Sequence, residues 1–167
     1  MTVRADAPHF MEIDGRRWRT TDPAIPEPFR AELVDELMRA RRAVGVLIKA
    51  GDDDLLADAR KQVHAAKVAL GERGEPWWEE PSADGRRTRI ESAILALAGH
   101  RSPDGTICPS DAARAIGGRS WREVVPEVRS VARRMARDGQ VEITQHGEPL
   151  DPDADWRGPV RIRLTPP

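Results

Sequence analysis

Five segments decide the fold of this chain: RIESAILALAGH (89–100), TICPSDAARAI (106–116), SWREVVPEVRSVARRMARDG (120–139), VEITQ (141–145) and VRIRL (160–164). Apolar residues in the first and third recur at the three- and four-residue spacing of a helix, and the second reads as a short strand followed by a short helix. The last two alternate apolar and polar residues, as half-buried strands do. This order of helix, strand, two helices and two strands predicts a winged helix, which is a form of helix-turn-helix domain.

Local signals refine the long helix of this unit. Ser120 and Glu123 have the spacing of a capping box, which would start the helix at Trp121. Pro126 lacks a backbone N–H and crowds the preceding turn, so it predicts either a kink or a helix that begins later. The loop over residues 146–158 would form the wing.

The C-terminal half resembles an uncharacterised bacterial family, domain of unknown function 3253. The resemblance runs through ICPSDAARA (107–115), VEITQ (141–145) and GPVRIR (158–163), and it includes Trp121-Arg122. It implies a winged fold like a helix-turn-helix, and it implies no known reaction, ligand or catalytic residue.

The first half predicts a β-hairpin and two helices. Asp14-Gly15 tolerates the positive φ of a tight turn, and in that register Met11 faces Trp18 while Glu12 pairs with Arg17. Apolar residues recur at helical spacing over about 28–50 and 54–70, and two helices joined so closely should run antiparallel. We therefore predict an α+β chain, in which an N-terminal β-hairpin plus antiparallel helical hairpin (1–75) and a linker (76–85) precede the winged-helix domain (86–167).

This first half also resembles small bacterial proteins labelled Tol biopolymer transporters. The resemblance rests on IDGRRWR (13–19), TDP (21–23) and ALGERGEPWW (69–78).

Charge and hydropathy limit the classes of function. The formal net charge of the chain is −1, so nothing in it demands a polyanionic partner. Residues 1–80 hold 13 basic and 16 acidic residues, a net of −3, whereas residues 81–167 hold 14 and 12, a net of +2. We find no apolar run of membrane-spanning length and no signal peptide, so we expect a soluble, cytoplasmic protein without a membrane partner.

Arginines on the long helix suggest double-stranded DNA as a partner. Arg122, Arg129, Arg133 and Arg137 fall on one face of that helix, opposite its apolar side. In a winged helix this is the helix that enters the major groove, where Arg contacts guanine or phosphate. An ordinary solvated face is the alternative interpretation. The full set of candidate DNA-binding residues is Arg86, Arg87, Arg89, Arg119, Arg122, Arg129, Arg133 and Arg137.

Acidic residues in the wing favour a different function. Glu148, Asp151, Asp153 and Asp155 would repel phosphate. The alternative to a DNA-binding or regulatory protein is therefore a protein-interaction adaptor. The two helices of the first half bury little surface alone, and a homodimer could complete their core. A third hypothesis is a small-molecule protein or enzyme with a pocket near Trp77 and Trp78.

We predict no catalytic residue, no cofactor and no metal site. Cys108 is the only cysteine, and a lone Cys in a strand is more often an apolar filler than a nucleophile. The four histidines are scattered without the spacing of metal ligands. The leading hypothesis is therefore non-enzymatic.

Overall fold

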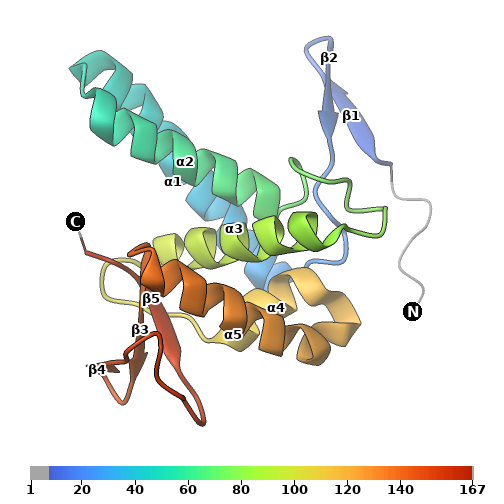
Figure 1. Cartoon of the computed structure of the whole chain (residues 1–167). Coiled ribbons are helices and arrows are strands. Elements are labelled where there is room, and N and C mark those ends of the chain that lie inside the picture. The colour runs from blue at the N-terminus through green and yellow to red at the C-terminus, as the bar shows by residue number, and fades with distance from the viewer. Residues whose placement is uncertain (1–7, 167) are drawn as a thin grey trace.

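The computed structural model describes residues 8–166 and has the predicted α+β architecture (Figure 1). Its elements are β1 (Phe10–Ile13), β2 (Arg16–Arg19), α1 (Glu27–Ala50), α2 (Asp53–Ala69), α3 (Ala83–Arg101), α4 (Pro109–Gly117), the 3-10 turn η1 (Gly118–Ser120), α5 (Trp121–Arg137), β3 (Val141–Gln145), β4 (Glu148–Pro149) and β5 (Arg161–Leu164). No helix within this part of the chain has an apolar stretch that would cross a membrane.

The N-terminal hairpin has the predicted register, with Met11 opposite Trp18 and Glu12 opposite Arg17. Asp14 and Gly15 both have positive φ, as a two-residue turn of this type requires. The predicted ion pair between Glu12 and Arg17 was wrong. Arg17 instead lies over the Phe10 ring, 3.7 Å from its centroid, because a guanidinium group gains from the face of an aromatic ring.

Helices α1 and α2 form the predicted antiparallel hairpin. Gly51 ends α1 in the left-handed conformation and donates its N–H to Leu47, and the Asp52 side chain caps α2 by accepting from Leu55 N at 3.1 Å. The base of the hairpin is buried, whereas Val46 near its tip is 65% exposed. The tip extends beyond the rest of the molecule (Figure 1).

Helix α3 is the centre of the structure, with α1 and α2 on one side and α4 and α5 on the other (Figure 1). Ile90, Ile94 and Leu97 are fully buried, and a single apolar core runs through them from α1 to β5. At its end, Arg101 binds Glu32 of α1 and Asp111 of α4. The hydrogen bonds that Arg101 donates to the Glu32 carboxylate raise the pKa of Arg101 above its ordinary value.

Helix α3 begins at Ala83, earlier than the predicted start near Arg89. The Ser82 hydroxyl accepts from Gly85 N, and the Glu75 carboxylate accepts in turn from the Ser82 N–H and hydroxyl. This capping satisfies backbone donors that the first turn would otherwise leave free. It extends the helix into a segment whose sequence carries no apolar periodicity.

The C-terminal elements follow the order predicted for a winged helix. Strand β3 pairs antiparallel with β5, and Ile107 before α4 bridges to Ile162. Strand β4, which pairs with the end of β3, was not predicted. The predicted capping box does not form, because Ser120 belongs to η1 and its side chain makes no cap bond. Helix α5 nevertheless begins at Trp121 and continues through Pro126.

Candidate nucleic-acid interface on α5

Helix α5 separates an apolar face from a cationic one, as its sequence predicted. Val128, Val131, Ala132 and Met135 are buried in the core. The opposite face carries arginines, and their contacts divide it into two parts. The C-terminal part is covered by the loop between β4 and β5, and the N-terminal part is open.

Arg133 holds the covering loop. Its Nη1 donates to the carbonyl oxygens of Pro152 and Ala154 at 2.5 and 2.6 Å, and its guanidinium lies 4.0 Å from the Trp156 ring centroid. Trp156 is only 7% exposed, and its Nε1 donates to the Asp151 carbonyl at 3.0 Å. A side chain engaged in this way stabilises the loop, and the donors of its Nη1 are used within the molecule.

Two neighbours of Arg133 also contact this loop. Arg137 binds Asp153 through its Nε at 2.6 Å, so this loop carboxylate neutralises the charge of Arg137. Arg129 makes two longer bonds, 3.3 Å to the Gly158 carbonyl and 3.5 Å to that of Trp156. Arg129 is therefore the least firmly held of the three.

The start of α5 carries a second group of arginines. Arg122 and Arg114 lie 4.4 and 4.5 Å from the ring centroid of the half-buried Trp121, and Arg119 is exposed on η1. Over the described residues 8–166, no carboxylate lies within 4.0 Å of the guanidinium nitrogens of these three residues. We call Arg114, Arg119, Arg122 and Trp121 the turn cluster.

Two glycines create the turn cluster. A Cβ on Gly117 would come within 3.1 Å of a Val124 methyl, and Gly118 has a φ of 57°. A larger residue at either position would push α4 away from α5 or strain the backbone. Arg114 was not among the predicted site residues, because only this turn brings it beside Trp121. Its exposed position on the polar side of α4 was the only sequence signal.

The remaining candidates lie on α3. Arg86 has carboxylates of Glu80 and Glu127 at 3.6 and 3.7 Å, and Arg87 binds Asp84 at 3.1 Å. Arg89 donates to Asp22 at 2.7 Å, and both side chains are largely buried. The structure thus does not bring the eight predicted arginines into one surface.

The other candidate residues from the sequence are Cys108, the scattered histidines, Trp77 and Trp78. Cys108 precedes α4, and its sulfur accepts a hydrogen bond from Arg161. Among residues 8–166 there is no group of three or more His, Cys, Asp or Glu side chains that could hold a metal ion. Trp77 and Trp78 pack on the β-hairpin, where Trp77 Nε1 donates to the Thr20 carbonyl and Trp78 stacks on His9.

The open turn cluster and the covered helix face lie in one segment of the chain, and that segment is similar to a known family. Residues 87–165 match the family model described as protein of unknown function, DUF3253. This match confirms the resemblance predicted for the C-terminal half. The DUF3253 region contains the turn cluster, the covering loop and every candidate arginine except Arg86.

The comparisons give the DUF3253 region no reaction, ligand or partner. No curated protein is similar enough to the chain to count as a match. The predicted resemblance of the first half to Tol biopolymer transporters has no support from these comparisons.

Proposed function

We propose that this protein is a non-enzymatic, winged-helix DNA-binding or regulatory accessory protein. It contacts double-stranded DNA through the turn cluster. The observation that carries the proposal is the group of three guanidinium groups without a carboxylate partner around Trp121, at the start of α5.

The position of the cluster fits the way such domains bind. The helix that corresponds to α5 enters the major groove, and its N-terminal residues contact base edges. Arg122 lies in the first turn of α5, and Arg119 just before it. Their guanidinium groups can each bind guanine O6 and N7 or a phosphate, and the positive end of the helix dipole favours the same anions.

The other arginines of α5 take different roles in this proposal. Arg129, held by two long bonds, can turn toward the DNA backbone. Arg133 and Arg137 position the covering loop, since Arg133 donates to loop carbonyls and Arg137 forms an ion pair with Asp153. Arg89 joins α3 to the segment before α1, so we assign it no contact with DNA.

The proposed interface is small. With Arg114, Arg119, Arg122 and Arg129 as the cationic contacts, about four phosphates would be neutralised, and the logarithm of affinity would fall with that of salt at a slope of about −3 to −4. This slope is modest for a DNA-binding protein. It agrees with a net charge of −1 and with exposed acidic residues at Glu148 and Asp155.

Fluorescence anisotropy of a mixed-sequence duplex tests the proposal. The wild-type protein is expected to bind at a low salt concentration of about 50 mM. The Arg119→Glu/Arg122→Glu variant is expected to lose this binding. Arg16→Glu/Arg42→Glu makes the same change in charge on β2 and α1 and should retain binding. Equal binding by both variants would show that the turn cluster is not the interface.

The acidic loop favours one alternative, a protein-interaction adaptor. Glu148, Asp151 and Asp155 are exposed beside the covered face of α5, and they would attract a basic protein surface and repel phosphate. An adaptor of this kind would bind no duplex even at low salt. Its loop carboxylates, and not its arginines, would be sensitive to substitution.

A further inference from the structure

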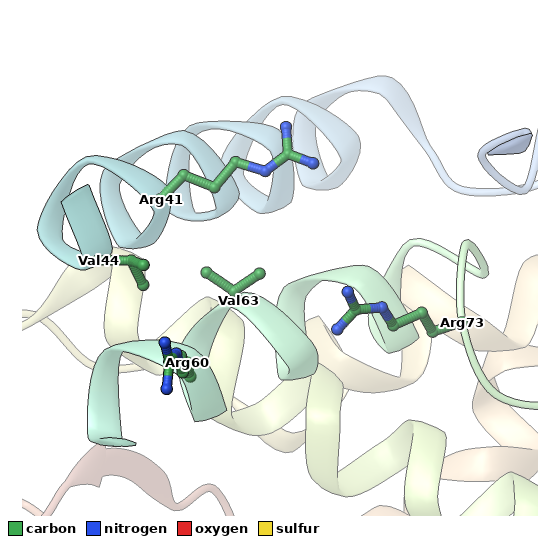
Figure 2. A pocket seen from close by; sticks show the side chains of 5 residues that line it. All are labelled: Arg41, Val44, Arg60, Val63 and Arg73. Atoms are coloured by element: carbon green, nitrogen blue, oxygen red, sulfur yellow. The ribbon is translucent and has the colours of Figure 1, made fainter. Parts of the chain in front are cut away.

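A groove on the helical hairpin forms a second cationic surface, away from the turn cluster. Arg41 and Val44 of α1, Arg60 and Val63 of α2, and Arg73 after α2 line it, with a cavity volume of about 350 Å³ (Figure 2). The two valines form an apolar floor between the helices. The arginines lie around it, and the Arg73 side chain extends toward Val63 (Figure 2).

These arginines lack the carboxylate partners that Arg39 and Lys61 of the hairpin have. Arg39 binds Glu36 at 2.6 Å, and Lys61 is 3.5 Å from Asp58, each in an i, i+3 pair. Arg41 and Arg60 have no acidic residue three or four positions away on either side. Arg73 Nη1 lies 3.4 Å from His64 Nδ1. Within residues 8–166, no carboxylate lies within 4.0 Å of the three guanidinium groups that line the groove.

Lys67 of α2 is a buried cation whose charge interacts with those of Arg41 and Arg73. It is 5% exposed, with its Nζ 4.0 Å from Glu72 and 4.9 Å from the Trp18 ring centroid. Burial is the main cause that lowers the pKa of Lys67. The negative charge of Glu72 raises this pKa, whereas the positive charges of Arg41 and Arg73 lower it further. Three cations therefore act on one another here, and a bound anion would relieve their repulsion.

We infer that this groove binds a small molecule with two linked phosphate groups, such as a diphosphate ester. Its phosphates lie among Arg41, Arg60 and Arg73, and its apolar part lies on Val44 and Val63. Three uncompensated positive charges match the charge of a diphosphate near neutral pH. Guanidinium groups bind phosphate oxygens through paired hydrogen bonds.

The size of the groove favours a small ligand over a macromolecule. Ligand pockets are typically about 300 to 1,000 Å³, and this groove lies at the lower end of that range. A diphosphate with one ring or short apolar chain would fill it. The site is separate from the DUF3253 region, because residues 41–73 precede it.

Calorimetric titration of the full chain with inorganic pyrophosphate, without added metal, tests the inference. We expect saturable binding with one site per chain, and a melting temperature that rises by several degrees at about 100 times Kd. Sulfate at equal ionic strength should bind at least tenfold more weakly. The Arg41→Gln/Arg73→Gln variant should lose at least tenfold in affinity for pyrophosphate, whereas Arg42→Gln/Lys49→Gln on the same helix should not.

Several results would overturn the inference. One is that sulfate and pyrophosphate bind with equal affinity, and another is that Arg41→Gln/Arg73→Gln keeps the wild-type affinity for pyrophosphate. A third is that the protein binds a hexaglutamate peptide but not pyrophosphate. The melting temperature without ligand shows whether each variant is folded. The Arg119→Glu/Arg122→Glu variant should bind pyrophosphate normally, so this result separates the groove from the DNA interface.

Discussion

The guanidinium group of Arg133 lies 4.0 Å from the ring centroid of Trp156, and this contact fixes the loop between β4 and β5 against α5. The same guanidinium donates to two loop carbonyls, so one side chain provides stacking, charge and hydrogen bonds. A loop with three aspartates is thereby held on the face of α5 that carries Arg129, Arg133 and Arg137. The consequence is that the loop lies over the side of α5 that carries Arg129 and Arg133, whereas Arg122 at the start of the helix is exposed.

Trp156→Ala should destabilise the protein by about 3 to 5 kcal/mol, as other buried Trp to Ala changes do. Trp156 is 7% exposed, and its loss would also remove the surface on which Arg133 rests. Chemical denaturation measures the free energy of unfolding. Trp18→Ala is the control, because Trp18 is 40% exposed and should matter much less. Equal effects of the two changes would argue against a structural role for the loop.

Gly99→Ala should cost about 1 to 3 kcal/mol through overpacking. A Cβ on Gly99 would come within 2.8 Å of Glu36 Oε1, and that carboxylate is fully buried in an ion pair with Arg39. Gly45→Ala is a matched control in α1, since nothing lies within 4 Å of its Cβ. There alanine should stabilise the helix by about 0.5 to 1 kcal/mol. In thermal unfolding, we expect Gly99→Ala to lower the melting temperature and Gly45→Ala to raise it.

The ion pair between Arg89 and Asp22 should show strong coupling in a double-mutant cycle. Asp22→Ala alone should cost about 3 kcal/mol or more, because it leaves a charge uncompensated in a largely buried site. It also removes the carboxylate that accepts a hydrogen bond from the Ala24 N–H. Arg89→Ala and the double variant complete the cycle. Additive effects would mean that the two residues act independently, contrary to the structure.

Acid should weaken the start of α3 through Glu75. Hydrogen bonds from the Ser82 hydroxyl and N–H lower the pKa of the Glu75 carboxyl below its ordinary value of 4.5. Its contribution is therefore present above about pH 4.5, the unfolded value, and is lost as the pH falls through the lower pKa of the folded state.

The melting temperature followed from neutral pH to pH 3 measures this effect. Glu75→Gln should melt lower than the wild type near neutral pH, and the difference should shrink in acid. Glu79→Gln is the control, since Glu79 is exposed and follows the same tryptophans. A difference between wild type and Glu75→Gln that stays constant with pH would contradict the assignment.

Local chemistry made much of the fold predictable. The Asp14-Gly15 turn fixed the register of β1 and β2, and apolar periodicity placed α1, α2 and α5 to within one or two residues. The early start of α3 was missed because its cap depends on Glu75, which no spacing rule links to Ser82. Strand β4 was missed because two residues carry no pattern.

The candidate site was less accessible to sequence reasoning. Periodicity placed Arg129, Arg133 and Arg137 on one face of α5, but it could not show that a loop covers that face. Trp156 lies in a segment rich in Asp, Gly and Pro, where a buried aromatic residue is unexpected. Arg114 reaches Trp121 only through the tight turn at Gly117 and Gly118. Contacts across turns and loops decide the site, and a single sequence does not encode them as a pattern.

The salt dependence of duplex affinity tests the central claim most directly. Anisotropy titrations of the wild type and of Arg122→Gln at several salt concentrations give the slope of log affinity against log salt. We predict a wild-type slope of about −3 to −4, reduced in magnitude by about one in Arg122→Gln. An affinity independent of salt, or an identical slope in both proteins, would contradict the proposal that the start of α5 binds DNA.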